Sequence, residues 1–403
     1  MTVVERFIRY AKMNTQSKEG TDQSPSTSVQ WDLAHLLVKE CTDLGLSQVL
    51  LSEHGIVTAT LPGNTDGAPT MGWIAHMDTA SDLSGEHVQP AFVENYNGKA
   101  IQLNEKYTLS PDDFPELTDY IGQTLITTDG NTLLGADDKA GIAEILTAIE
   151  FLIQNPDLPH GTIRLGFTPD EEVGQGADHF DVTEFAADFA YTIDGGALGS
   201  IEFENFNAAS GIVTIQGRNV HPGSAKHKMI NANHLAQEFD ALLPHFDRPE
   251  YTDDYEGFFH LMNTHASVEE ATLDYIIRDH DAKTFEWRKD FFIKCANQLN
   301  QKYKQELVSV CVKDSYQNMK EMILPHYHVV QTALDSMEAV GVTPRIDPIR
   351  GGTDGARLSY LGLPCPNLFT GGHNYHGRFE FIPVESMEKA VNVLVEIAKR
   401  VSK

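Results

Sequence analysis

The feature that most constrains the fold is a set of five short segments in which His, Asp or Glu follows an apolar run. These segments are Trp73–Asp78, Gly135–Lys139, Pro169–Glu172, Thr192–Gly195 and His373–His376. Four of them follow a predicted strand, and in open parallel sheets ligands bind at the carboxyl ends of the strands. Asp137 instead begins a predicted helix, where backbone N–H groups and the helix dipole favour a carboxylate. The pattern therefore predicts an α/β fold with a polar site along one edge of its sheet.

The first and last parts of the chain share an alternation of strands and helices. Residues 31–44 have the apolar spacing of a helix, and another helix begins near Asp138. Predicted strands cover residues 56–61, 71–75, 162–167, 189–193 and 365–369, and a closing helix covers residues 384–401. Such alternation indicates a mostly parallel sheet with helices on both faces.

The middle of the chain has a different rhythm, in the order strand, helix, strand, strand, helix, strand. Its predicted strands cover residues 211–216, 258–264, 271–278 and 306–312, and its helices cover residues 231–243 and 282–304. This order is typical of a ferredoxin-like unit. We therefore expect residues 1–208 and 322–403 to form one catalytic α/β domain, interrupted by an inserted α+β domain at residues 209–321.

Composition excludes several classes of partner. The formal net charge of −28 argues against nucleic acid or an anionic membrane. No apolar stretch approaches the roughly 20 residues of a membrane span, and Met1–Phe7 lacks the features of a secretory signal. The cysteines are scattered, without a CxxC pair, at Cys41, Cys295, Cys311 and Cys365. We therefore expect a reducing, cytoplasmic location.

Two histidines have the setting of metal ligands. His76 and Asp78 lie two residues apart, so on an extended segment both side chains point the same way. This suits a metal-ligating imidazole whose second ring nitrogen is held by a carboxylate. The alternative is a His at a strand end, followed by an Asp that begins a turn. His376 lies in the glycine-punctuated loop Gly371–Gly377, which favours a ligand over a core residue.

The acidic residues also have simpler interpretations. One of Asp137 and Asp138 would be the N-cap of the following helix. Glu171 and Glu172 would form a solvated pair in a turn, and Asp194 would form a turn before two glycines. In the functional interpretation one Glu binds metal while its neighbour transfers a proton, because a metal on one makes the two titrate differently. The joint occurrence of these residues at one sheet edge favours the functional interpretation.

Nitrogen and oxygen ligands without thiolate fit zinc, with cobalt or manganese as alternatives. Two divalent cations would balance three carboxylates and one hydroxide, and a partly buried cluster requires such neutrality. Paired ions of this kind clamp the attacking and leaving atoms of a hydrolytic reaction. The chain has no GxxxxGK[ST], GxSxG or HExxH motif, and Gly174–His179 departs from the dinucleotide fingerprint. The sequence thus predicts a metal-dependent hydrolase.

Three further stretches, Thr15–Lys18, Gly122–Gly130 and Thr132–Gly141, extend the pattern along the chain. With them the chain resembles, over essentially its whole length, the dinuclear-zinc metallopeptidases, which include aminopeptidases, carboxypeptidases, dipeptidases and amino-acid deacylases. The stretches are typical of the group that cleaves tripeptides. The resemblance implies an aminopeptidase that hydrolyses the N-terminal peptide bond of tripeptides with the help of two zinc ions.

The resemblance also implies a role for each residue of the cluster. The expected metal ligands are His76, Asp137, Glu172, Asp194 and His376. Asp137 would bridge the two ions, with His76 and Asp194 completing one site and the other two ligands completing the second. Glu171 would be the general base, and Asp78 would orient the imidazole of His76.

In this family the inserted domain is a lid that often forms a homodimer. His221 lies in a motif, Val220–Gly223, that resembles the one whose His stabilises the oxyanion. Without the resemblance, His221 would simply cap a turn. Arg278 and Arg350 are candidates for holding the C-terminal carboxylate of the peptide, because arginine pairs with carboxylates bidentately. Either arginine would otherwise form an ordinary ion pair.

Three other functions fit parts of the pattern. A dipeptidase, carboxypeptidase or N-acyl-amino-acid deacylase would use the same scaffold on another substrate. A non-catalytic metal-binding protein would keep the fold, although the complete ligand set and Glu171 argue against it. A dinuclear phosphoesterase would use the same ligand types, although the match along the whole chain favours a peptidase.

Overall fold

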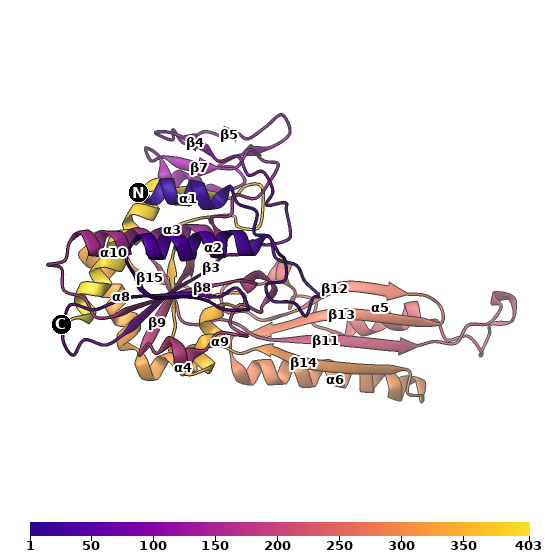
Figure 1. Ribbon diagram of the computed structural model, residues 1–403. Coiled ribbons are helices and arrows are strands. Elements are labelled where there is room, and N and C mark those ends of the chain that lie inside the picture. Colours follow the sequence, from indigo (N-terminus) through magenta and orange to yellow (C-terminus); the bar gives the residue numbers. More distant parts are fainter. The chain divides into compact units, whose positions relative to one another are not determined.

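The computed structural model describes residues 1–403 (Figure 1). It contains two compact units. Unit 1 comprises Met1–Phe203, Glu321–Asp347 and Thr353–Lys403, and unit 2 comprises Glu204–Lys320 and Pro348–Gly352. Unit 2 is therefore an insertion, and one short segment, Pro348–Gly352, returns to it from a region that we expected to belong wholly to the other domain.

Unit 1 is built on an eight-stranded sheet with the strand order β1-β2-β8-β3-β9-β16-β10-β15. Strands β3, β8, β9 and β16 run parallel to one another at its centre. The bounds are β1 Ser47–Leu51, β2 Val57–Leu61, β3 Met71–His76, β8 Ile163–Thr168, β9 Phe189–Gly195, β10 Ser200–Glu202, β15 Arg345–Ile346 and β16 Asn367–Phe369. All residues of β3 and β8 are buried, as strands covered on both faces require.

Helices cover both faces of this sheet (Figure 1). Helix α3 (Ala136–Gln154) packs on β3 and β9, and α1 (Val3–Ala11) and α10 (Val384–Val401) pack against it. On the opposite face a buried cluster joins Ile74, Phe185 and Leu358, which belong to β3, α4 and α9. The other helices of unit 1 are α2 Gln30–Asp43, α4 Val182–Phe185, α7 Lys320–Ile323, which begins at the last residue of unit 2, α8 His328–Ala339 and α9 Asp354–Tyr360. The expected mostly parallel α/β architecture is confirmed.

A smaller layer of unit 1 was not assigned from the sequence. It contains a three-stranded sheet, β17-β7-β4, and a two-stranded sheet, β5-β6. The bounds are β4 Ala91–Val93, β5 Ile101–Gln102, β6 Thr108–Leu109, β7 Leu125–Thr127 and β17 Phe381–Pro383. Its core includes Tyr96, Leu117, Tyr120 and Phe381. Strands of two or three residues are too short to show a period of two in the sequence, and β17 comes from the far end of the chain.

Unit 2 is a four-stranded antiparallel sheet with the order β12-β13-β11-β14. The bounds are β11 Asn207–Gln216, α5 Ala232–Leu242, β12 Phe258–Ala266, β13 Glu270–Asp279, α6 Ala282–Tyr303 and β14 Val308–Tyr316. Side chains of both helices and the inward-facing strand residues share one core, which includes Val213, Phe239 and Phe292. The element order and sheet order are those of a ferredoxin-like unit, as expected.

None of the helices in the structure is long and apolar enough to cross a membrane.

Candidate metal centre

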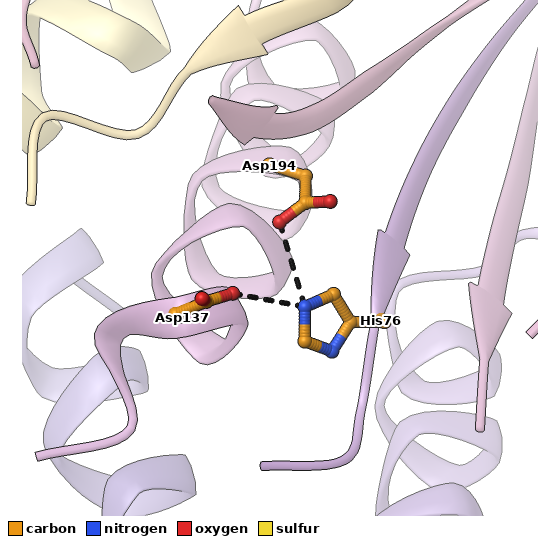
Figure 2. Close-up of side chains that lie close together, drawn as sticks. All are labelled: His76, Asp137 and Asp194. Carbon is orange, nitrogen blue, oxygen red and sulfur yellow. Dashed lines mark hydrogen bonds and ion pairs between the residues drawn. The ribbon is translucent and has the colours of Figure 1, made fainter. Parts of the chain in front are cut away.

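Three side chains from separate elements of unit 1 meet above the central sheet (Figure 2). His76 ends β3, Asp137 lies at the start of α3, and Asp194 lies near the end of β9. His76 Nε2 is 2.9 Å from Asp137 Oδ1 and 3.4 Å from Asp194 Oδ1. One ligand atom from each residue lies within 4.8 Å of the others. This geometry could hold one cation.

A second group shares Asp137. His376 Nε2 is 3.2 Å from Asp137 Oδ2 and 2.9 Å from Glu172 Oε2. The other carboxylate oxygen of Glu172 is buried and has no hydrogen-bond partner, so it is available to a cation. His376 lies in the loop between β16 and β17, and its side chain is 45% exposed, whereas that of Glu172 is 5% exposed. The second group is therefore the more open to solvent.

Asp137 stands between the two groups, because each of its carboxylate oxygens faces a different imidazole. A carboxylate in this arrangement suits a bridge between two cations. All five predicted ligands lie in these two groups. Imidazole nitrogen and carboxylate oxygen are donors that zinc, cobalt and manganese accept, so the donor set fits a pair of divalent ions.

Burial and close contacts shift the pKa values of several groups in the cluster. Burial, together with the neighbouring Asp137, raises the pKa of Glu172 to about 7. Burial likewise raises the pKa of Asp194 to about 6. Hydrogen bonds to Asp137 and Glu172 raise the pKa of His376 to about 11. The carboxylates and the imidazole therefore lie close enough to shift one another's pKa, and cations placed among them would balance the charges of the carboxylates.

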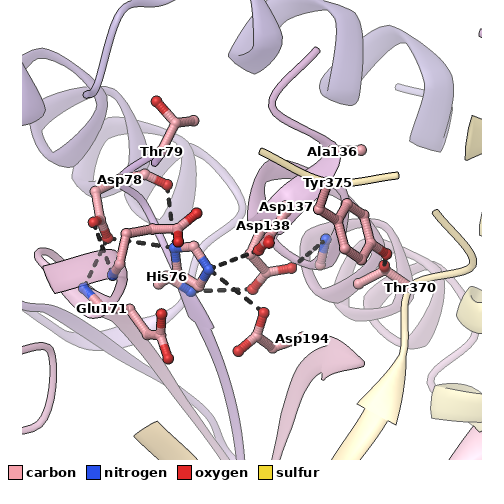
Figure 3. Close-up of polar contacts among 12 residues, drawn as sticks. His76, Asp78, Thr79, Ala136, Asp137, Asp138, Glu171, Asp194, Thr370 and Tyr375 are labelled. Carbon is pink, nitrogen blue, oxygen red and sulfur yellow. Dashed lines mark hydrogen bonds and ion pairs between the residues drawn. The ribbon is translucent and has the colours of Figure 1, made fainter. Parts of the chain in front are cut away.

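Glu171 and Asp78 occupy the same edge of the sheet (Figure 3). Burial and the nearby Asp194 raise the pKa of Glu171 well above its usual range. Asp78 is fully buried, and its carboxylate accepts the backbone N–H of Glu171 at 3.0 Å and that of Glu172 at 3.2 Å. Its Oδ1 also lies 3.3 Å from His76 Nδ1. One carboxylate therefore holds the imidazole and the turn that carries both glutamates.

That turn has a further anchor on the opposite side. Asp170 has a left-handed backbone, with φ 61°, directly before the short 3₁₀ helix Glu171–Val173. Its buried carboxylate accepts the backbone N–H of Ser26 at 2.8 Å and the side-chain amide of Gln30 at 2.7 Å. The N-terminal segment therefore fixes the point at which the chain turns into the site.

Two other residues support the ligands through contacts that the sequence did not indicate (Figure 3). Asp138 is fully buried and accepts the backbone N–H of His76 at 3.1 Å. Tyr375 Oη lies 2.9 Å from Thr370 Oγ1 and 3.3 Å from the Gly195 carbonyl oxygen, which it joins by a hydrogen bond. The loop that carries His376 is thereby tied to the strand that carries Asp194. The sequence indicated one of Asp137 and Asp138 as a helix N-cap, and the Asp138 carboxylate accepts the Gly141 N–H at 3.2 Å as such a cap does. Its bond to His76 and the role of Tyr375 had no signal in the sequence.

His373 lies outside both ligand groups. Its Nε2 is hydrogen-bonded to Tyr120 Oη at 2.6 Å, and its ring stacks on Phe381 with centroids 4.8 Å apart. Burial lowers the pKa of His373 to about 4. This histidine is a neutral tether between the metal loop and the smaller layer of unit 1.

The remaining predicted residues belong to unit 2. His221 is exposed, and its Nδ1 accepts the Gly223 N–H at 3.1 Å. Arg278 donates from one terminal nitrogen to the Arg350 carbonyl at 2.9 Å, while its Nε is buried without a partner. The guanidinium of Arg350 donates to the backbone oxygens of Asp254, at 2.8 Å, and of Glu256, at 3.2 Å. Arg350 is thus held by the backbone of its own unit, whereas Arg278 makes fewer hydrogen bonds.

Comparisons with known proteins agree with the fold and the site. Over residues 87–400 the chain matches the peptidase family M20/M25/M40. It is 59% identical over 398 residues to the Peptidase T of Halothermothrix orenii, covering 98% of each chain. Its fold is similar to that of the aminopeptidase PepT from Bacillus cereus, with a TM-score of 0.77, 25% identity, and coverage of 100% and 98% of the two chains.

A more distant structural likeness links the fold to a metal-binding relative. The YXEP protein of Bacillus subtilis, described as a dinuclear metal binding peptidase, aligns with a TM-score of 0.67 at 13% identity, over 99% of this chain and 97% of that one. The resemblance that the sequence motifs indicated is confirmed by these comparisons.

Proposed function

Because this chain belongs to the peptidase family M20/M25/M40, we propose that it is a metal-dependent aminopeptidase that removes the first residue of tripeptides. The observation that carries the proposal is the pair of ligand groups that share Asp137, with Glu171 beside them. The relatives named Peptidase T, at 59% and 54% identity over nearly the whole chain, support the tripeptide substrate.

We assign two divalent cations to the centre and propose zinc, with cobalt or manganese as substitutes. His76, Asp137 and Asp194 would hold one ion, and Asp137, Glu172 and His376 the other. Support comes from the nitrogen and oxygen donor set, the unpartnered oxygen of Glu172 and the dinuclear relative. When bound, such ions polarise a scissile carbonyl and make water a better nucleophile at neutral pH.

Within this centre, Glu171 is the proposed general base. Its carboxylate takes a proton from the attacking water and passes that proton to the amine that leaves. Asp78 is the proposed positioning residue, because its carboxylate accepts the backbone N–H of Glu171 and lies beside the Nδ1 of His76. Placement by backbone contacts leaves both carboxylate oxygens of Glu171 free for proton transfer.

Residues of unit 2 complete the proposed mechanism. His221, on an exposed loop, would donate a hydrogen bond to the developing oxyanion, where such donors have large effects. Of the two candidates for the C-terminal carboxylate of the peptide, Arg278 is the stronger, since it donates only to the Arg350 carbonyl, whereas Arg350 donates to several acceptors of its own unit. Arg350 would have to give up hydrogen bonds to backbone oxygens, so we assign it to holding the loop around Asp254 and Glu256.

We further propose that the chain forms a homodimer through unit 2 and works in the cytoplasm. Strands β12 and β14 are the edges of the unit 2 sheet, and an unpaired edge is a natural surface for pairing with a second copy. None of the four cysteines forms a disulfide, which suits a reducing compartment.

The test combines metal analysis with turnover of three related tripeptides: free, N-acetylated and C-amidated. We expect two ions per chain, cleavage of the first bond of the free peptide, no cleavage of the acetylated one and weakened binding of the amidated one. Release of acetate from the acetylated peptide would indicate a deacylase, and release of the C-terminal residue would indicate a carboxypeptidase. A protein that binds no metal would overturn the proposal.

A further inference from the structure

Glu380, just before β17, is a buried carboxylate that receives four backbone N–H groups. Its Oε2 accepts the N–H of Leu134 at 2.6 Å and of Gly135 at 3.0 Å. Its Oε1 accepts the N–H of Ala136 at 2.6 Å and of Asp137 at 3.3 Å. Glu380 is only 1% exposed. Both oxygens are therefore saturated by one short stretch of backbone.

The stretch that Glu380 binds is the entrance to α3. Its backbone is irregular, because Asp137 and Asp138 have non-helical φ and ψ angles and the regular helix follows them. The N–H groups of residues 134–137 therefore find their acceptor in the Glu380 carboxylate rather than in a helical carbonyl. Gly135 has φ 77°, a left-handed conformation that turns successive N–H groups toward a common point. Such a concavity is a ready anion site. The protein fills it with its own carboxylate.

This contact bears directly on the metal centre. Asp137 is the last of the four donors, and its carboxylate is the one that faces both imidazoles. Glu380 also lies four residues after His376, on a segment that is pinned where His373 and Phe381 exchange backbone hydrogen bonds of 2.9 and 3.1 Å. Glu380 thus joins the backbone that carries the shared ligand to the backbone that carries a ligand of the second group.

We propose that Glu380 is a positioning residue, which sets the place of the Asp137 carboxylate and thereby the binding of both metal ions. The inference rests on the metal centre proposed above. It assigns Glu380 no contact with metal or substrate. Its effect passes through the backbone of residues 134–137, so a substitution of Glu380 should weaken metal binding at both ion positions rather than at one.

The test is the substitution Glu380→Gln in the full chain. The amide replaces one acceptor oxygen with an NH₂ group, which would face two N–H donors instead of accepting from them. Cobalt(II) titrated into metal-free protein, against a competing chelator, measures both affinities, and the absorption bands of bound cobalt report ligand geometry. We expect both affinities to fall by about 10- to 100-fold, the usual effect of losing a group that orients a ligand. We also expect altered cobalt bands.

The matched control is Glu385→Gln. Glu385 also accepts a backbone N–H, that of Thr124, through both oxygens at 3.1 Å, but its donor lies outside the metal-bearing segments. We expect this control to bind cobalt as the unsubstituted protein does. If Glu380→Gln fails to fold, as judged by circular dichroism, Glu380→Asp carries the same test, because it keeps the charge but is too short to span all four donors.

The outcomes separate this inference from the proposed function. A folded Glu380 variant with unchanged cobalt affinities and spectrum would overturn the positioning role, even if its melting temperature fell, because helix capping alone would explain that loss. If the unsubstituted protein takes up no cobalt, the metal centre itself fails, and the inference with it. If the unsubstituted protein binds two cobalt ions and the variant binds both of them more weakly, the result supports both the metal centre and the positioning role of Glu380.

Discussion

The metal centre of unit 1 and the candidate substrate residues of unit 2 are held in very different ways. Around the metal ligands, Asp78, Asp138 and Glu380 are almost fully buried, and each accepts backbone N–H groups of the segments that carry ligands or Glu171. His221, by contrast, lies on an exposed loop whose hydrogen bonds are local. Ligands must be placed to within about half an ångström, whereas a group that meets the substrate gains from freedom to close around it.

The largest expected effect tests the rigid side of this comparison. Glu171→Ala should lower kcat by about 10³-fold, within the range for loss of a general base, while the bound metal stays at the level of the unsubstituted protein. The reason is that Glu171 is held through its backbone by Asp78, so truncating its side chain leaves the ligand framework intact. Steady-state kinetics and metal analysis of the same sample check this. Near-normal turnover would remove Glu171 from its role.

The next effect tests the exposed loop of unit 2. His221→Ala should lower kcat by about 10²-fold, as loss of one oxyanion donor does, with no change in metal content or melting temperature. His227→Ala, another histidine in the same exposed stretch, serves as the control and should keep normal kcat. If both substitutions reduce kcat equally, the loop matters as a whole and His221 has no special part.

A smaller effect separates the two arginines of unit 2. Arg278→Ala should raise KM for a free tripeptide by about 10-fold, the effect of one lost charge-assisted hydrogen bond, and should leave KM for the C-amidated peptide nearly unchanged. Arg350→Ala should lower the melting temperature instead, because its guanidinium holds backbone oxygens. If Arg350→Ala raises KM without lowering the melting temperature, and Arg278→Ala leaves KM unchanged, Arg350 rather than Arg278 binds the carboxylate of the peptide.

The smallest effect concerns the tether at His373. Its pKa is about 4 in the folded protein, against an ordinary value of 6.5, so the unfolded chain binds the proton more readily between these values. The contribution of His373 to the free energy of unfolding is therefore fully present above pH 6.5 and is lost as pH falls toward 4. We expect the free energy of unfolding to fall by about 2 kcal/mol between pH 7 and pH 5 for this reason. Denaturant unfolding of the metal-free protein at both pH values measures this.

The control for this pH dependence is built from a matched pair of variants. His373→Gln can still accept the Tyr120 hydroxyl but cannot titrate, so it should lose most of this pH dependence. His35→Gln, at an exposed position on α2, should keep it. If the free energy of unfolding falls by the same amount between pH 7 and pH 5 in both variants, a group other than His373 governs the stability in acid.

Much of the architecture was visible in local patterns. The closing helix was expected at residues 384–401 and lies at Val384–Val401, and the long helix of unit 2 was expected at 282–304 and lies at Ala282–Tyr303. Both have the apolar periodicity of a helix that covers a core. The β17-β7-β4 layer was missed because its strands have three residues each and because β17 pairs with β7 across more than 250 positions of the chain.

Some residues of the site could likewise be identified from the sequence, and others could not. Residue type and position brought five segments to one sheet edge, and the resemblance of their motifs to the family named the ligands: His76, Asp137, Glu172, Asp194 and His376. Glu380 could not be named, because its partners lie 243 to 246 residues away along the chain. Nothing near Glu380 in the sequence distinguishes it from a surface glutamate.

The sequence by itself therefore determined which residues can carry the chemistry and at which edge of the sheet they gather, because residue type and periodicity are local properties. Only the tertiary structure decided that Asp137 turns one oxygen to each imidazole, that His373 pairs with Tyr120, and that Glu380 fills the entrance of α3. Hydrogen bonds depend on distances of a few tenths of an ångström between atoms far apart in the chain, and no local pattern records those distances.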